Sequence, residues 1–96
     1  MSQVLNQRVF ACGHEQVSVA AGAEMGFVQI DVTGYKKATD TVLLTFDYNN
    51  QSDIQLTAPL AVYNATDGSN FFVAGSGVFN SGASAVNVFV NWAVLR

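Results

Sequence analysis

Hydrophobic and polar residues alternate along most of this chain with a repeat of two residues. That repeat is typical of β-strands with one buried face, and no stretch shows the 3.6-residue repeat of an amphipathic helix. The sequence therefore predicts an all-β protein whose short strands are separated by turns. The predicted strands cover residues 4–11, 16–20, 26–33, 41–48, 53–57, 60–65, 70–74 and 84–95.

The same alternation predicts which face of each strand is buried. In segment 41–48 apolar residues occupy every second position, and the residues between them are mostly polar. The last strand differs, because apolar residues such as Phe89 and Leu95 also fall on the side that should meet water. Its core face is predicted to hold Val86, Val88, Val90, Trp92 and Val94, and its outer face Asn87, Phe89, Asn91, Ala93 and Leu95.

Turn-forming residues separate the predicted strands. Asp67-Gly68 is a hairpin dipeptide because both residues tolerate positive φ. Gly75-Ser76-Gly77 and Asn80-Ser81-Gly82 are predicted to interrupt the chain before the last strand. Seven or eight short strands at this spacing are typical of an antiparallel β-sandwich, jelly-roll arrangements included. The 96 residues are expected to form one domain, 1–96, in which residues 1–8 either begin the first strand or form an extended N-terminal arm.

Charged residues are scarce and unevenly placed. They make up 11% of the chain, whereas an average soluble domain has about a quarter. From Ile54 to the C-terminus only Asp67 and Arg96 are charged. Because charges keep strand edges and sheet faces from associating, this composition predicts a homo-oligomer. The predicted interface consists of the outer face of the last strand (Phe89, Asn91, Ala93, Leu95) and the arm (Val4, Leu5, Arg8).

Composition also argues against several kinds of partner. The formal net charge is −3 with four basic residues, so no basic surface for nucleic acid is expected. No apolar run reaches the roughly 18 residues of a membrane-spanning helix, so membrane insertion is not expected. The first eight residues do not resemble a secretory signal, which predicts synthesis in a cytoplasm.

One short segment combines groups that could perform chemistry. Cys12-Gly13-His14-Glu15 brings a thiol, an imidazole and a carboxylate together in sequence. Nucleophilic catalysis needs such groups apposed across a fold, with a third group that orients the base. The segment is instead predicted to be a turn between two strands, with Cys12 packed inward. We therefore expect no enzymatic activity and no cofactor.

Two tyrosines beside polar turns indicate a different kind of surface. Aromatic rings next to Asn and Asp side chains are a combination that sugar-binding β-sandwich modules use. The residues of this candidate ligand loop are Tyr35, Tyr48, Asn49, Asn50 and Asp53. Segment 47–53 also offers oxygen atoms at alternate positions, although it lacks the glycine and closing glutamate of an EF-hand loop. Glycan, calcium and an ordinary Asx-rich hairpin loop all remain open.

The segment from Asn80 to Arg96 joins a Gly/Ser turn to a long alternating strand that ends near the last residue. In this it resembles the closing strand of small bacteriophage structural domains, namely capsid decoration (cement) proteins and fibre tips. The resemblance implies a non-enzymatic β-sandwich in a virion, made in the host cytoplasm. It further implies a homo-oligomer, with a trimer favoured, that contacts other virion proteins such as a major capsid protein. The alternative expectation is a carbohydrate- or receptor-binding module that uses the loop residues named above.

Overall fold

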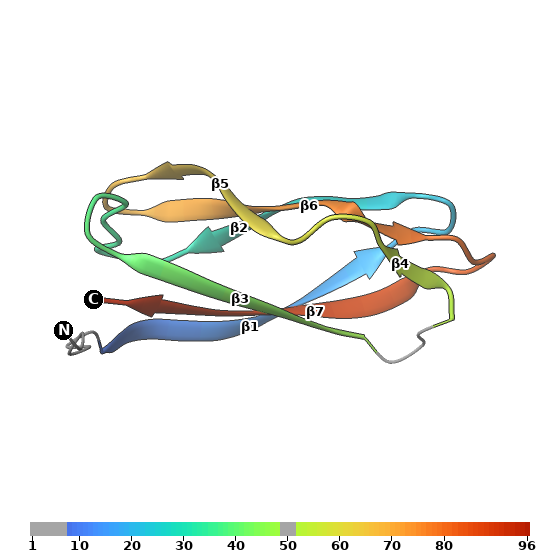
Figure 1. Cartoon of the computed structure of the whole chain (residues 1–96), viewed down its shortest axis with the longest axis horizontal. Helices are drawn as coiled ribbons and strands as arrows, with labels where there is room; N and C mark the ends of the chain where they lie inside the picture. Colours follow the sequence, from blue (N-terminus) through green and yellow to red (C-terminus); the bar gives the residue numbers. More distant parts are fainter. Residues whose placement is uncertain (1–7, 49–51) are drawn as a thin grey trace, which may run out of the picture.

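The computed structural model describes residues 8–48 and 52–96 and shows a β-sandwich of two packed antiparallel sheets (Figure 1). One sheet has three strands in the order β1-β7-β3, and the other has four, in the order β2-β6-β4 with β5 also paired to β6. The predicted fold class is confirmed. The strands are β1 (Val9–Val19), β2 (Glu24–Asp31), β3 (Thr41–Tyr48), β4 (Ile54–Leu56), β5 (Ala61–Thr66), β6 (Asn70–Asn80) and β7 (Val86–Leu95).

The core lies between the central strands of the two sheets, β7 and β6. Val88, Val90 and Val94 of β7 are fully buried, and so is Phe71 of β6. The indole of Trp92 continues the inner face of β7 and meets the Phe71 ring edge-on, with 6.1 Å between ring centroids. The two faces predicted for the last strand are therefore confirmed.

β1 is one strand of 11 residues where the sequence predicted two strands and a turn. The segment that was predicted to turn pairs with β7 in mid-strand, from Cys12 opposite Ala93 to Glu15 opposite Val90. Gly13 leaves room there for the Trp92 indole, which a Cβ atom at this position would overlap. Alternation along the continuous strand places Cys12 on the exposed outer face, so the predicted inward packing of this thiol is wrong.

β6 also continues through a predicted interruption. Gly75 and Gly77 lie inside the strand, where both are buried. A Cβ atom on Gly75 would collide with Met25 of β2, and one on Gly77 would lie 2.6 Å from the backbone nitrogen and oxygen of Ala58. Glycine inside a strand often marks such a close approach. The prediction was wrong because close packing and a turn leave the same signal in the sequence.

One buried side chain organises the connection between β6 and β7. Asn80 is fully buried. Its Nδ2 donates to the backbone oxygens of Val19 at 3.0 Å and Ser84 at 2.8 Å, and its Oδ1 accepts from the Gly82 amide at 2.9 Å. The chain turns after Asn80 as predicted, and the same side chain also binds the end of β1.

Candidate functional site

The outer face of the three-stranded sheet carries the predicted interface residues of the last strand. Phe89, Asn91, Ala93 and Leu95 are all partly exposed there. Because β7 is the central strand and pairs with both β1 and β3, these residues lie in the middle of the face. β7 can therefore offer its face to a second subunit, whereas its edges are already used within the chain.

A row of hydrogen bonds crosses this face. Asn91 donates from Nδ2 to the Asp47 carboxylate at 2.7 Å and to Thr45 Oγ1 at 3.2 Å, both on β3. A carboxylate can only accept, so the Oδ1 of Asn91 faces β1 and accepts from Nδ1 of His14. The His14 ring in turn stacks on Phe89, with 4.7 Å between centroids. The row therefore links all three strands and positions the Phe89 ring on the surface.

Apolar side chains surround this row. Leu43 of β3 is 51% exposed and lies opposite Ala93, and Leu95 continues the apolar surface toward the end of β7. A shallow hollow of ≈ 240 Å³ lies between Leu43 and Asn91. Among the outward-facing residues of β1, β7 and β3, Asp47 is the one with a formal charge at neutral pH.

Cys12 and His14 share the outer face of β1 but lie on an open sheet surface. They pair with Ala93 and Asn91 of the neighbouring strand, and both side chains are exposed. Within residues 8–48 and 52–96, no group of three or more His, Cys, Asp or Glu side chains is placed to hold a metal ion. The same residues include no helix long and apolar enough to cross a membrane.

Arg8 is the one residue of the predicted arm interface that the structure describes. Its backbone amide donates to the oxygen of Arg96, and its backbone oxygen accepts from the amide of Arg96, both at 2.8 Å. This pair extends the ladder between β1 and β7, so the Arg8 backbone is held within its own chain. Val4 and Leu5 lie outside the described residues.

The candidate ligand loop does not form one site. Tyr35 lies in the loop before β3 and Tyr48 at the other end of that strand, so the length of β3 separates them (Figure 1). Tyr35 is only 3% exposed and packs against Phe71, with 5.2 Å between ring centroids. Its ring therefore belongs to the core, which corrects the prediction that it could stack on a ligand.

Tyr48 and Asp53 lie at the opposite end of the sandwich from Tyr35. Tyr48 is half-buried and packs beside Phe46, with 5.4 Å between ring centroids. The backbone oxygen of Asp53 accepts from the amide of Ser81 at 2.8 Å and from its hydroxyl at 3.0 Å. Asn49 and Asn50 lie outside the described residues.

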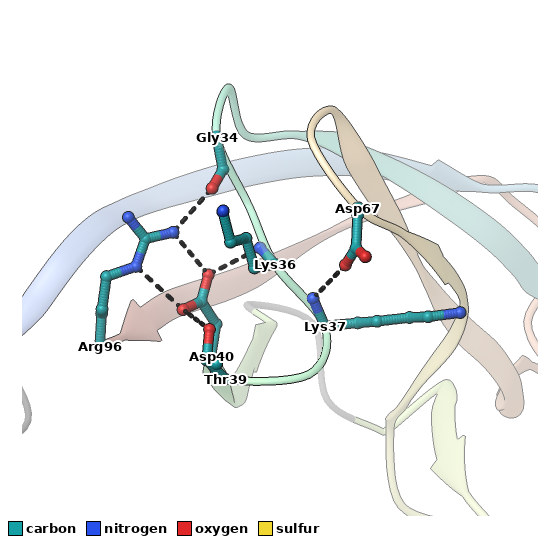
Figure 2. A network of polar contacts seen from close by, with 7 residues as sticks. All are labelled: Gly34, Lys36, Lys37, Thr39, Asp40, Asp67 and Arg96. Carbon is teal, nitrogen blue, oxygen red and sulfur yellow. Dashed lines mark hydrogen bonds and ion pairs between the residues drawn. The ribbon is translucent and has the colours of Figure 1, made fainter.

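An ion pair holds the loop between β2 and β3 against the end of β7 (Figure 2). Arg96 donates to Asp40 from Nε at 3.0 Å and from Nη2 at 2.9 Å, and Nη2 also donates to the oxygen of Gly34 at 2.7 Å. Asp40 further accepts from the Lys36 amide at 2.8 Å and from the Thr39 hydroxyl at 3.2 Å. The contacts tie both ends of this loop to the last residue of the chain.

These donors change the acidity of Asp40. The hydrogen bond from Arg96 is the main cause that lowers the pKa of Asp40 to about 2, although burial of the carboxylate acts in the opposite direction. Nearby, burial raises the pKa of Tyr35, and the carboxylates of Asp40 and Asp67 raise it further. The loop therefore holds a charged Asp40 beside a neutral Tyr35 at physiological pH.

Replacing Asp40 with Asn should destabilise the protein at neutral pH and flatten its response to acid. The folded-state pKa of about 2 lies below the ordinary value of 3.8, so the carboxylate stabilises the folded state above about pH 4. That contribution is lost as the pH falls through about 2. Urea denaturation between about pH 7 and pH 2 should show a smaller acid loss for Asp40→Asn than for the wild type. The exposed Asp31→Asn is the matched control, and parallel profiles for Asp40→Asn and wild type would contradict the prediction.

The outer face of the four-stranded sheet carries an aromatic pair that sequence reasoning missed. Phe27 of β2 and Tyr63 of β5 stack across β6, with 4.8 Å between centroids and 11° between planes. Their side chains are 60% and 52% exposed. On the same side of β2, Gln29 Nε2 donates to Asp31 at 2.7 Å. The alternation of β2 could have predicted that Phe27 is exposed, because it places Phe27 on the same polar face as Gln29 and Asp31.

No family model, no curated protein and no solved structure matches this chain.

Proposed function

We propose that this protein is a non-enzymatic structural component that assembles with copies of itself through the outer face of the three-stranded sheet. The observation that carries the proposal is the apolar surface around Phe89, Ala93, Leu95 and Leu43, which has Asp47 as its one formal charge. Burial of each large apolar side chain contributes about 2 kcal/mol to association. A few such side chains per subunit favour a stable oligomer.

The polar groups of this face favour burial against a second copy. Burying a polar group costs free energy unless it is hydrogen-bonded. Here Asn91 uses both its amide hydrogens and its oxygen within the row, and Asp47 already accepts from it. Asn91 can therefore be covered by an apolar surface without losing these bonds, whereas the Asp47 carboxylate, on the edge strand β3, must stay at the rim in contact with water. Polar groups that are already hydrogen-bonded and are surrounded by apolar side chains are typical of homo-oligomer interfaces.

The virion is the setting that we propose for this assembly. The support is the resemblance of the segment from Asn80 to Arg96 to the closing strand of capsid decoration proteins and fibre tips. A protein that adds association free energy to a shell or fibre needs complementary surfaces and no catalytic centre. In this proposal the protein forms a homo-oligomer, with a trimer favoured, and contacts other virion proteins such as a major capsid protein.

Placing a negative charge at Phe89 should dissociate the oligomer. Phe89→Asp puts an unpaired carboxylate near Asp47 in the middle of the proposed interface, where burying a charge is costly. Light scattering after size exclusion, over a roughly hundredfold range of concentration, should give an oligomer for the wild type. The variant should give a smaller species than the wild type, with a mass that is a whole multiple of the 10.2 kDa chain.

Phe27→Asp is the matched comparator, because it places the same charge on the outer face of the other sheet. Its mass should equal that of the wild type, and circular dichroism should show both variants folded. A monomeric wild type, or dissociation by Phe27→Asp alone, counts against the proposed face.

Carbohydrate binding is the second candidate function, and the Phe27–Tyr63 pair is the observation that favours it. Two exposed rings beside Gln29 and Asp31 combine a stacking surface with hydrogen-bonding groups. Sugar recognition would then use the outer face of the four-stranded sheet and not the loops at its ends. The comparator Phe27→Asp also tests this candidate, because it should remove any binding that a glycan array detects for the wild type. A blank array for the wild type excludes the candidate for the glycans on it.

A further inference from the structure

In the part of the chain that the structure describes, the two open sheets have four outer edges, and features that discourage pairing with another strand occur along three of them. On β1, Glu15 lies opposite the buried Val90 and so points inward, and the register shifts between Val9 and Ala11. On β2, the register with β6 shifts before Gly26, where φ is +75°. Inward charges and irregularities of this kind are how β proteins protect exposed edges.

The third protected edge is made by β4 and β5, which pair one after the other with β6. β4 has only three residues, and Pro59 lies between the two strands. In β5 the register shifts between Tyr63 and Thr66, and Asn64 adopts a φ of +56°. A short strand, a proline and a left-handed residue leave no regular template for a partner strand.

β3 has none of these features. Its eight residues pair with β7 one for one, from Thr41 opposite Leu95 to Tyr48 opposite Val88, without a shift in register. It contains no glycine or proline, its inward residues carry no charge, and its single charged residue, Asp47, points outward. Within the described chain β7 is its only strand partner. A regular edge of this kind is a template for one more extended strand.

An apolar crevice lies beside this edge. It has a volume of ≈ 250 Å³, and Leu44 and Phe46 of β3 face Leu56, Pro59 and Leu60 across it. The inward side chains of β3 are consequently only half-buried, whereas most of those of β7 are fully buried. A strand added to the edge of β3 would cover apolar surface that the chain leaves open.

We infer that β3 is a self-pairing edge, at which two copies of the protein join their β3 strands antiparallel about a twofold axis at Leu44. The two three-stranded sheets would then form one continuous sheet. This contact uses a strand edge, so it does not depend on the face proposed above. The β3 edge is thus a second surface for self-association, and the strand that occupies it is β3 of another copy.

The sequence of β3 is complementary to itself in this register. An axis at Leu44 keeps inward residues opposite inward residues, with Leu44 opposite its own copy and Val42 opposite Phe46. On the outer side, Leu43 lies opposite Thr45 of the second copy. The two Asp47 carboxylates lie six residues apart along the pair, or about 20 Å at ~3.3 Å per residue. An axis at Thr45 would instead place Leu43 opposite Asp47, an apolar side chain against a charge.

Disulfide trapping tests both the pairing and its register. Leu43→Cys and Thr45→Cys are made separately in a Cys12→Ser background, and both positions are exposed, so folding should be retained. Opposite residues in an antiparallel pair are ~4.5–5.5 Å apart at Cα, within the ~4.4–6.8 Å that a disulfide spans. In this register, position 43 of one copy lies two residues along the strand from position 43 of the other copy, and the same holds for position 45. The two Cα atoms would then be about 8 Å apart, which is too far for a disulfide.

The expected result is a covalent dimer when the two variants are mixed and oxidised, and monomer when either is oxidised alone. Each variant alone is the control for random collision. Monomer in all three samples overturns the pairing, and a dimer of Thr45→Cys or Leu43→Cys alone overturns the register. Adding Phe89→Asp to both variants distinguishes the β3 edge from the outer face of the sheet. The disulfide should still form at the β3 edge when this substitution disrupts the contact at the outer face.

Discussion

Asn80→Asp should lower the free energy of unfolding by more than about 3 kcal/mol, among the largest effects of any single substitution in this protein. The side chain is fully buried, and its Nδ2 donates to the backbone oxygens of Val19 and Ser84. Aspartate replaces that donor with an oxygen, so a buried carboxylate would face two carbonyl oxygens. The variant therefore loses two hydrogen bonds and gains a buried charge for which the Gly82 amide is the one donor left among the described contacts of this side chain.

Urea denaturation at neutral pH measures this effect. Asn87→Asp is the matched control because it makes the same substitution on an exposed residue of β7, where a change within about 0.5 kcal/mol is expected. Asn80→Ala should fall between the two, since it removes the bonds without adding a charge. Acid should restore part of the stability of Asn80→Asp, because the protonated carboxyl can donate one hydrogen bond. Equal stability of Asn80→Asp and Asn87→Asp would show that Asn80 does not organise the connection.

Gly77→Ala should destabilise the protein by about 2–3 kcal/mol. A Cβ atom at this position would lie 2.6 Å from both the nitrogen and the oxygen of Ala58. Those are backbone atoms, so relief requires the segment between β4 and β5 to shift as a whole. The same segment donates from the Thr57 amide to the oxygen of Gly77 at 2.7 Å, and a shift would weaken that bond as well.

Thermal and urea denaturation of Gly77→Ala should be compared with Ser76→Ala, which changes the exposed neighbouring residue of β6. The control should stay within about 0.5 kcal/mol of the wild type. If both variants unfold at the same denaturant concentration, Gly77 has no packing role, and the glycine would have to be explained in another way.

The predicted interface residues show which structural features a local sequence pattern can predict. Alternation placed Phe89 and Asn91 on the outer face of the last strand, and the structure has them there. The hydrogen-bonded row to His14 and Asp47 could not be predicted, because it joins residues of three strands that are distant in the sequence. Tyr35 shows the reverse case: it adjoins a polar turn in sequence, yet the fold packs its ring into the core.

By itself the sequence determined the all-β sandwich and the inward and outward faces of β3 and β7. It could do so because successive side chains of a strand point to opposite sides, which is a property of the local backbone. Strand order was decided only in the tertiary structure, since it depends on contacts between segments far apart in the chain. That order made β7 a central strand and β3 an edge. The tertiary structure also explains why glycine is needed at positions 13 and 77. Each glycine leaves room for a residue of another segment, Trp92 beside Gly13 and Ala58 beside Gly77.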